Sequence, residues 1–427
     1  MFISEKIPIF AQAFNTRVDM KQIKMLWLLA ALLTFSGITV LTSCSSDDHN
    51  VPFEEPVAQE PSITSKTYVA ESKMTVINFE YPSVDPFGKP ATLSGTITIG
   101  DEVNASTPAR GLLLYNHFTV YRADQCPSKG NLGIQKFICG SGLITVSADY
   151  YGFGCTEDRP QAYCISAVNA QASVDALLAA KKLLPGLGYS WNDDILFNAG
   201  YSQGGQTSMA VVRLIDEKYP DLHITYTFAG GGSYDIPETY RQFIQSGATD
   251  MPSSVISVLL SYNEYFKLGI PLSDIFVEPT LSHLDDWVLS KRYTSEEIDR
   301  LVGSGQIADF TTPAMLDLES GLSKRFFEVL DRDNLCKGWT PRKDQKILLV
   351  HHVKDKTVPV ANTVNMAAFL QEQGVEGLRV MKSDYGQLAN RTPHEVGAVI
   401  FAVTAVSEVC QILGIPMWFK LEDLNLF

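Results

Sequence analysis

The chain has 427 residues, 45% of them hydrophobic and 19% charged, with a net charge of −14 at pH 7. This length and apolar content are enough for one large core plus an insertion. No cluster of Lys and Arg recurs with aromatic residues, so nucleic acid is not expected as a partner.

The first 44 residues are typical of an export signal. Lys21 and Lys24 precede the apolar run 25–40, and small residues follow it. A positive head, a short apolar segment and small residues before a cleavage point describe a secretory signal peptide. Met20 is a better start for this signal than Met1, so we expect residues 1–19 to be absent from the natural chain. The alternative is an uncleaved membrane anchor, for which the apolar run is short.

The signal ends in Leu41-Thr42-Ser43-Cys44, which resembles a bacterial lipobox. The resemblance implies lipid on Cys44, cleavage before it, and a membrane partner in the bacterial cell envelope. The acidic start after it, Ser45 to Asp48, resembles the export tags of some surface lipoproteins and favours the outer membrane. Residues 45–62, with three prolines, are predicted to form a flexible tether.

Alternating strands and helices are predicted from residue 63 onward. Thr67–Tyr81 and Ala91–Ile99 alternate in hydrophobicity around a turn at Asp85-Pro86-Phe87-Gly88, which predicts a hairpin. Apolar strands then alternate with helices up to Ile236. This order is typical of an α/β fold with a mostly parallel sheet flanked by helices. Residues 63–236 are predicted as the first part of the core.

The strand Gly111–Tyr115 runs into Asn116-His117-Phe118-Thr119. A backbone N–H near Phe118 or Thr119 could supply half of an oxyanion hole if a nucleophile follows. His117 could belong to such a site or be a structural hydrogen-bonding residue, and the sequence leaves both open.

The most informative motif is Gly200-Tyr201-Ser202-Gln203-Gly204, a G-x-S-x-G pattern between an apolar run and a helical pattern. A strand that reverses directly into a helix holds its serine in strained backbone geometry, and bulky flanking residues would clash with the helix. The motif therefore predicts a nucleophile elbow with Ser202 at its tip. The backbone N–H of Gln203 is expected to stabilise an oxyanion.

Residues 237–341 read mostly as helices, and this stretch is predicted to be a helical cap inserted after the sixth strand. Its aromatic residues are expected mainly to pack between cap and core: Tyr262, Tyr265, Phe266, Phe276, Trp287, Phe326 and Phe327. Strands and helices resume over 342–427, the predicted second part of the core.

A serine nucleophile needs a histidine base and a carboxylate that orients it, in the chain order serine, acid, histidine. The strand Ile347–Val353 is followed by a loop that contains Asp355, our predicted acid. Asp384, after the last predicted strand, is the alternative.

Elimination among the seven histidines leaves His394 as the base, in a polar turn before the final apolar helix. The others precede the acid strand, lie in the insertion or end that strand: His49, His117, His223, His283, His351 and His352.

These motifs resemble α/β-hydrolase fold proteins, in particular the secretory lipase and esterase family. The resemblance rests on G-Y-S-Q-G-G at 200–205, D-Y-Y-G-F-G at 149–154, K-D-K-T-V-P at 354–359 and the Pro-His before the last helix. It covers about residues 66–413 and implies hydrolysis of an ester of a small molecule, lipid or polysaccharide.

Serine carboxylic-ester hydrolysis is therefore the predicted function. The alternatives are a serine peptidase of the same fold and a noncatalytic surface lipoprotein that uses the cleft for binding. No Cys/His spacing resembles a zinc site, so neither metal nor cofactor is expected. The six cysteines other than Cys44 could form disulfides, with Cys155–Cys164 and Cys126–Cys139 near enough to pair, or remain free thiols.

Overall fold

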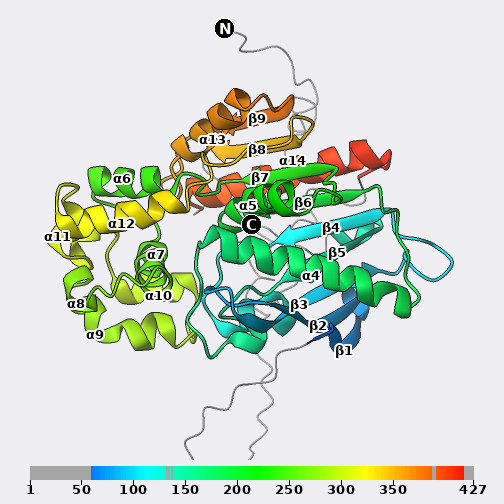
Figure 1. Ribbon diagram of the computed structural model, residues 1–427, viewed down its shortest axis with the longest axis horizontal. Coiled ribbons are helices and arrows are strands. Elements are labelled where there is room, and N and C mark those ends of the chain that lie inside the picture. The colour runs from blue at the N-terminus through cyan, green and yellow to red at the C-terminus, as the bar shows by residue number, and fades with distance from the viewer. Residues whose placement is uncertain (1–58, 131–134, 136–137, 387–390, 418–427) are drawn as a thin grey trace, which may run out of the picture. The chain divides into compact units, whose positions relative to one another are not determined.

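The computed structural model describes residues 59–130, 135, 138–386 and 391–417 (Figure 1). The predicted signal peptide, the predicted lipidation site Cys44 and most of the predicted tether 45–62 lie outside these residues. The described residues belong to one compact unit.

The described strands form a nine-stranded sheet in the order β1-β2-β3-β5-β4-β6-β7-β8-β9. Pairings among β1, β2, β3 and β5 are antiparallel, and all pairings from β5 to β9 are parallel. The predicted α/β class with a mostly parallel sheet is therefore confirmed. The strands are β1 Ser62–Val69, β2 Met74–Val84, β3 Pro90–Gly100, β4 Gly111–Asn116, β5 Leu143–Ala148, β6 Leu196–Tyr201, β7 Tyr226–Gly230, β8 Lys346–His352 and β9 Gly377–Ser383.

Helices cover both faces of this sheet, as the sequence of β4 illustrates. Leu112 and Leu114 pack in one apolar cluster with helices α4 (Ser166–Gly186), α5 (Gln203–Lys218) and α13 (Ala361–Glu372). Leu113 and Tyr115 pack in a second cluster with Phe401 of helix α14 (Pro393–Leu413). Because side chains along a strand alternate between faces, a continuous apolar run requires burial on both sides.

The opening hairpin differs from the prediction. The stretch Thr67–Tyr81 was expected as one strand, but a 3-10 turn at Ala70–Ser72 divides it into β1 and β2. Lys73 closes that turn with a left-handed backbone (φ 48°), and β1 then folds back antiparallel to β2. The polar sequence Glu71-Ser72-Lys73 suits a turn better than a buried strand.

The extra strand shifts the strand count, so the predicted helical insertion follows the seventh strand, β7, and not the sixth. Figure 1 shows its helices gathered to one side of the sheet. They are α6 Ile236–Ser246, α7 Pro252–Tyr265, α8 Leu272–Ile275, α9 Thr280–Leu284, α10 Ser295–Val302, α11 Pro313–Leu316 and α12 Gly321–Arg332. They share one apolar cluster with Tyr121 and residues 162–165 of the core part, and all seven aromatic residues predicted to pack are found in it.

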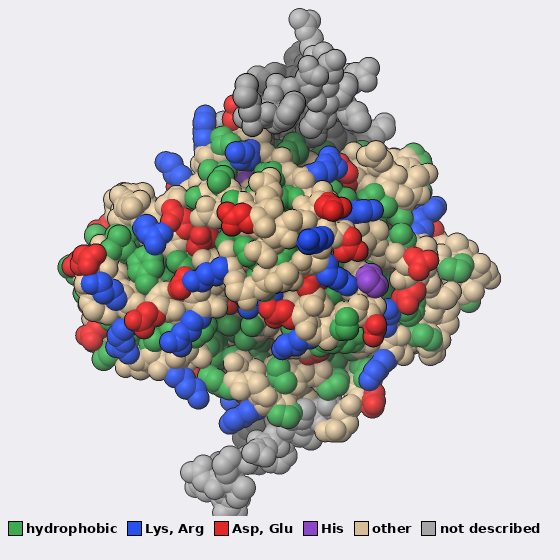
Figure 2. Space-filling view, turned by 45° about the horizontal axis from the view of Figure 1, so that its top comes forward, with side chains coloured by type: hydrophobic (Ala, Val, Ile, Leu, Met, Phe, Trp, Pro, Cys, Tyr) green, Lys and Arg blue, Asp and Glu red, His purple; other side chains and the backbone are tan. Residues whose placement is uncertain are grey.

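Helix α14 is the one described helix that is long and apolar enough to cross a membrane, with 21 residues and a mean hydropathy of 2.0. Its buried residues Phe401, Ala405 and Val409 pack on the sheet beside Phe197 of β6 and Phe228 of β7. One face of the helix thus packs on the sheet, and 39% of its apolar window is buried. The surface seen in Figure 2 mixes Lys and Arg with Asp and Glu.

The described cysteines are free thiols. Cys126, Cys155, Cys164, Cys336 and Cys410 form no disulfide, so neither the Cys155–Cys164 nor the Cys126–Cys139 pair forms. Burial raises the pKa of the Cys126 and Cys164 thiols to about 12, which keeps both protonated at neutral pH.

Asp299 gives the insertion a pH-dependent stability. Its carboxylate accepts a hydrogen bond of 2.7 Å from the backbone N–H of Ser253, in the first turn of α7. Burial raises the pKa of Asp299 to about 6. The folded protein therefore holds this proton up to higher pH than the unfolded chain, whose Asp titrates near about 4.

We expect this group's contribution to stability to fall as the pH rises from about 4 to about 6, because the native state binds more protons there. Asp299→Asn keeps an oxygen that can cap α7 but removes the titration. The difference in unfolding free energy between wild type and variant should change by on the order of 2 kcal/mol across this window. Urea unfolding at several pH values measures it. If the difference in unfolding free energy between wild type and Asp299→Asn is the same at every pH, the raised pKa of Asp299 is contradicted.

Candidate active site

Ser202 lies at the junction of β6 and α5, in the elbow that the G-x-S-x-G pattern predicted. Its backbone has φ 59° and ψ −122°, a left-handed conformation that a residue with a side chain rarely adopts. A Cβ on Gly200 would collide with the backbone of Gly204, and one on Gly204 would collide with the carbonyl oxygens of Asn116 and His117. The two glycines thus allow the close approach of strand, helix and neighbouring loop that holds the strained serine.

His394 joins Ser202 to Asp355. Its Nε2 lies 2.9 Å from the Ser202 Oγ, and its Nδ1 lies 2.6 Å from the Asp355 Oδ2. A carboxylate can only accept, so Nδ1 carries the proton and Nε2 is left to accept the serine hydroxyl proton. The structure brings together three side chains that the sequence placed far apart, one at the elbow, one after β8 and one in the first turn of α14.

Asp355 is held as a buried carboxylate. Its Oδ1 accepts two backbone hydrogen bonds, from Thr357 and Val358, each 2.9 Å long. Burial alone would raise its pKa, but the adjacent His394 and the hydrogen bonds from His351 and His394 outweigh it and hold the pKa below the usual range. Asp355 therefore remains ionised at neutral and mildly acidic pH. Asp384, the alternative acid, is exposed, and His394 Nδ1 faces Asp355 instead.

Two further residues support this arrangement and were missed from the sequence. His351 is buried, with Nε2 2.8 Å from the Val358 carbonyl oxygen and 3.4 Å from the Asp355 Oδ2, and Nδ1 2.7 Å from the Thr363 hydroxyl. The Tyr201 hydroxyl donates to the His394 carbonyl oxygen over 2.6 Å. The position of His351 on a strand excludes it as the base, and its contact with Asp355 depends on a register that the sequence does not show.

The turn before α14 is well defined by its sequence. The Thr392 hydroxyl accepts from the Glu395 N–H, and the Glu395 carboxylate accepts from the Thr392 N–H, which forms a capping box. Pro393 occupies the first helical position, where its missing N–H is not needed. His394 is thereby presented in the first turn of a fixed helix.

The predicted oxyanion residues lie on either side of the elbow. Gln203 is the first residue of α5, where backbone N–H groups have no partner within the helix. Phe118 follows β4, two residues after Asn116, whose carbonyl packs against Gly204. His117 lies with Nδ1 2.7 Å from the Phe118 carbonyl and Nε2 3.2 Å from the Asp149 carbonyl, and burial lowers its pKa. These contacts support the structural interpretation of His117.

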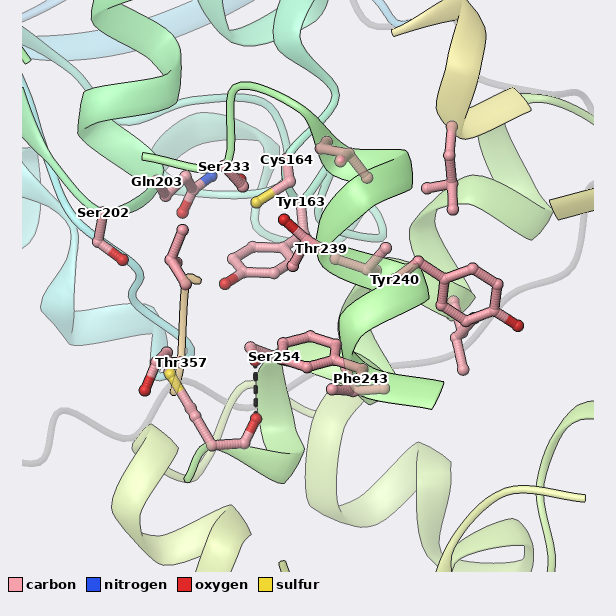
Figure 3. Close-up of a pocket in the computed structure, with 17 residues that line it drawn as sticks. Tyr163, Cys164, Ser202, Gln203, Ser233, Thr239, Tyr240, Phe243, Ser254 and Thr357 are labelled. Carbon is pink, nitrogen blue, oxygen red and sulfur yellow. Dashed lines mark hydrogen bonds between the residues drawn. The ribbon is translucent and has the colours of Figure 1, made fainter. Parts of the chain in front are cut away.

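A pocket that is partly open to solvent runs from Ser202 to the insertion helices α6 and α7 (Figure 3). Its described lining carries no charged side chain. The polar lining residues are Tyr163, Cys164, Ser202, Gln203, Ser233, Thr239, Tyr240, Ser254 and Thr357. The apolar ones are Ile236, Phe243, Met251, Val255, Val258, Leu259, Leu330 and Val358. Within the described parts of the chain, no group of three or more His, Cys, Asp or Glu residues could hold a metal ion.

No family model matches the sequence, and no curated protein matches it significantly. Solved structures do resemble it. The rice cell wall degrading esterase LipA from Xanthomonas oryzae has a TM-score of 0.70 and 22% identity, covering 83% of this chain and 98% of LipA. Candida antarctica lipase A in its closed state has a TM-score of 0.63 and 14% identity, covering 84% of this chain and 82% of the lipase. At these identities the likeness establishes the fold, which is the α/β-hydrolase fold.

Proposed function

We propose that this protein is a serine carboxylic-ester hydrolase. Ser202 would be the nucleophile, His394 the general base and Asp355 the acid that orients it. The carrying observation is the pair of contacts at 2.9 Å and 2.6 Å that link Ser202, His394 and Asp355 across one imidazole. An activated serine requires this order of nucleophile, base and orienting group.

The reaction would proceed through an acyl-enzyme. His394 Nε2 takes the Ser202 proton while Oγ bonds to the ester carbonyl carbon, and the backbone N–H groups of Gln203 and Phe118 stabilise the oxyanion. The C–O bond then breaks, and the departing alcohol takes the proton from His394. A water molecule, deprotonated by His394, attacks the acyl-enzyme, and Ser202 recovers its proton as the acid leaves.

The pocket lining favours an ester substrate over a peptide substrate. A peptidase that recognises a free amine would need an acidic side chain close to the serine, and the described pocket lining has none. Its apolar residues instead suit a neutral acyl group with a hydrocarbon part. The two similar structures named above are an esterase and a lipase by description, which agrees with this choice.

We also propose, from the sequence alone, that the enzyme is exported and anchored in the bacterial cell envelope through lipid on Cys44. The apolar run 25–40 and the Leu-Thr-Ser-Cys ending support this location. The substrate would then be an ester that reaches the cell envelope.

Reaction with a fluorophosphonate probe tests the function. We expect labelling of wild type and none of Ser202→Ala, because the probe bonds only to an activated serine. A panel of p-nitrophenyl esters and aminoacyl-nitroanilides then separates esterase from peptidase. A noncatalytic binding protein would leave wild type unlabelled, and that result would refute the proposal.

A further inference from the structure

The side chain of Gln203 is an unusual feature of the pocket. The residue is 2% exposed, and both amide atoms, Oε1 and Nε2, are buried without a hydrogen-bond partner. Figure 3 places its side chain beside Ser202 and Ser233, at the edge of the pocket. Burying an unpaired amide costs free energy, so this conformation favours a ligand that supplies the missing bonds.

Several other polar groups of the pocket already have partners. Tyr163 shares a hydrogen bond of 2.9 Å with Thr119, and Tyr240 donates over 2.8 Å to the Met315 carbonyl. The Ser254 hydroxyl donates over 2.7 Å to the Met251 carbonyl. The Tyr240 and Ser254 hydroxyls have already committed their protons and can only accept from a substrate, whereas the Gln203 amide has both a donor and an acceptor to offer.

We propose that the Gln203 side-chain amide is a specificity-determining group that binds a hydroxyl of the substrate's acyl part, close to the ester carbonyl. The inference rests on the proposed function. An amide offers both a donor and an acceptor, and a hydroxyl is the small neutral group that complements both. A carboxylate or ammonium fits poorly, because the described pocket lining carries no charge to pair with it.

The remaining side chains of the pocket indicate the chemistry of the rest of that acyl group. Beyond Gln203 lie the apolar side chains of Ile236, Phe243, Val255 and Leu259, which accept hydrocarbon. The acyl part stays bonded to Ser202 until water arrives, whereas the alcohol must leave, so the pocket beside Ser202 is assigned to the acyl part. The substrate class is an ester of a hydroxylated, otherwise apolar carboxylic acid.

The test compares kcat/KM for p-nitrophenyl 3-hydroxybutanoate with kcat/KM for p-nitrophenyl butanoate. Each value is divided by the rate constant for hydrolysis of the same ester by hydroxide alone, which corrects for its intrinsic reactivity. We expect wild type to favour the hydroxy ester by about tenfold or more in kcat/KM, since a site built for a hydroxyl discriminates against an analogue without it. In Gln203→Met, whose side chain is similar in length but lacks the amide, the ratio should fall to near one. Its backbone N–H, the proposed oxyanion donor, is kept.

Gln206→Met is the matched control. This residue lies on the same helix and is also buried with an unpaired Oε1, but its Nε2 donates over 3.1 Å to the Cys164 carbonyl and it does not line the pocket. Its ester ratio should equal that of wild type. The melting temperature of Gln203→Met should match or exceed that of wild type, because no satisfied hydrogen bond is removed. If this variant does not fold, Gln203→Leu serves in its place.

A wild-type ratio near one, or a ratio that survives in Gln203→Met, would overturn the inference while fluorophosphonate labelling and hydrolysis of both esters still support the proposed function. If wild type neither reacts with the probe nor hydrolyses either ester, the proposed function itself fails, and the inference falls with it.

Discussion

Asp355→Asn should lower kcat for ester hydrolysis by about 10³–10⁴-fold, the loss expected when a triad histidine is held in the wrong tautomer. The asparagine oxygen can keep the two backbone hydrogen bonds from Thr357 and Val358. Its NH₂ group then faces His394 Nδ1, which must accept. The imidazole proton moves to Nε2, where it points at the Ser202 hydroxyl and removes the base.

Single-turnover and steady-state kinetics of the purified variant measure this effect. Asp384→Asn is the control, because Asp384 is exposed and should leave turnover unchanged. Circular dichroism should show both variants folded. If Asp355→Asn retains turnover within about tenfold of wild type, or Asp384→Asn loses it, the acid has been misassigned.

The sequence was sufficient to predict the three side chains that meet at the elbow, because each depends on strand order. The G-x-S-x-G pattern requires a strand before Ser202 and a helix after it, and Asp355 follows from counting strands backward from the final helix. Parallel strands place their carboxyl ends at one edge of a sheet, so these loops converge regardless of the details of packing. This geometry explains why residues far apart in the chain could be paired from pattern alone.

The supporting contacts could not be predicted in this way. His351 contacts Asp355 because both lie at the end of β8 and their loop turns back, which depends on the backbone path through Lys354. The Tyr201 hydroxyl reaches the His394 carbonyl across 193 positions of sequence. Gln203 could be assigned an oxyanion N–H from the motif, but the unpaired state of its side chain depends on what packs around it.

The opening hairpin was mispredicted for a different reason. Hydrophobic alternation identifies strands only where one face is buried, and β1 is almost entirely exposed. Ser62–Val69 has no apolar period, so the sequence carries little signal of the break at Lys73 and predicts one strand where the structure has two. The strand count before the insertion was one too low as a result.

The close packing around Gly204 in the elbow predicts a large effect of substitution on stability. Gly204→Ala should destabilise the folded protein by at least about 3 kcal/mol or prevent folding, as expected for added bulk with no space to occupy. The added Cβ would meet the carbonyl oxygens of Asn116 and His117, which are backbone atoms and cannot rotate away. Any relaxation would have to separate α5 from the end of β4 and the loop after it, and Asn116, the last residue of β4, donates hydrogen bonds of 2.8 Å to Asn198 and 2.9 Å to Ser208.

Gly186→Ala is the matched control for this substitution. Gly186 ends α4, its backbone φ is not positive, and a Cβ there meets nothing within 4 Å. Alanine at that position should keep or raise the unfolding free energy by up to about 1 kcal/mol, because it restricts the unfolded chain. Urea unfolding and soluble yield of the two variants measure the contrast. If Gly204→Ala were as stable as Gly186→Ala, the loop after β4 could not be packed against the elbow, and the proposal of Phe118 as an oxyanion donor would lose its support.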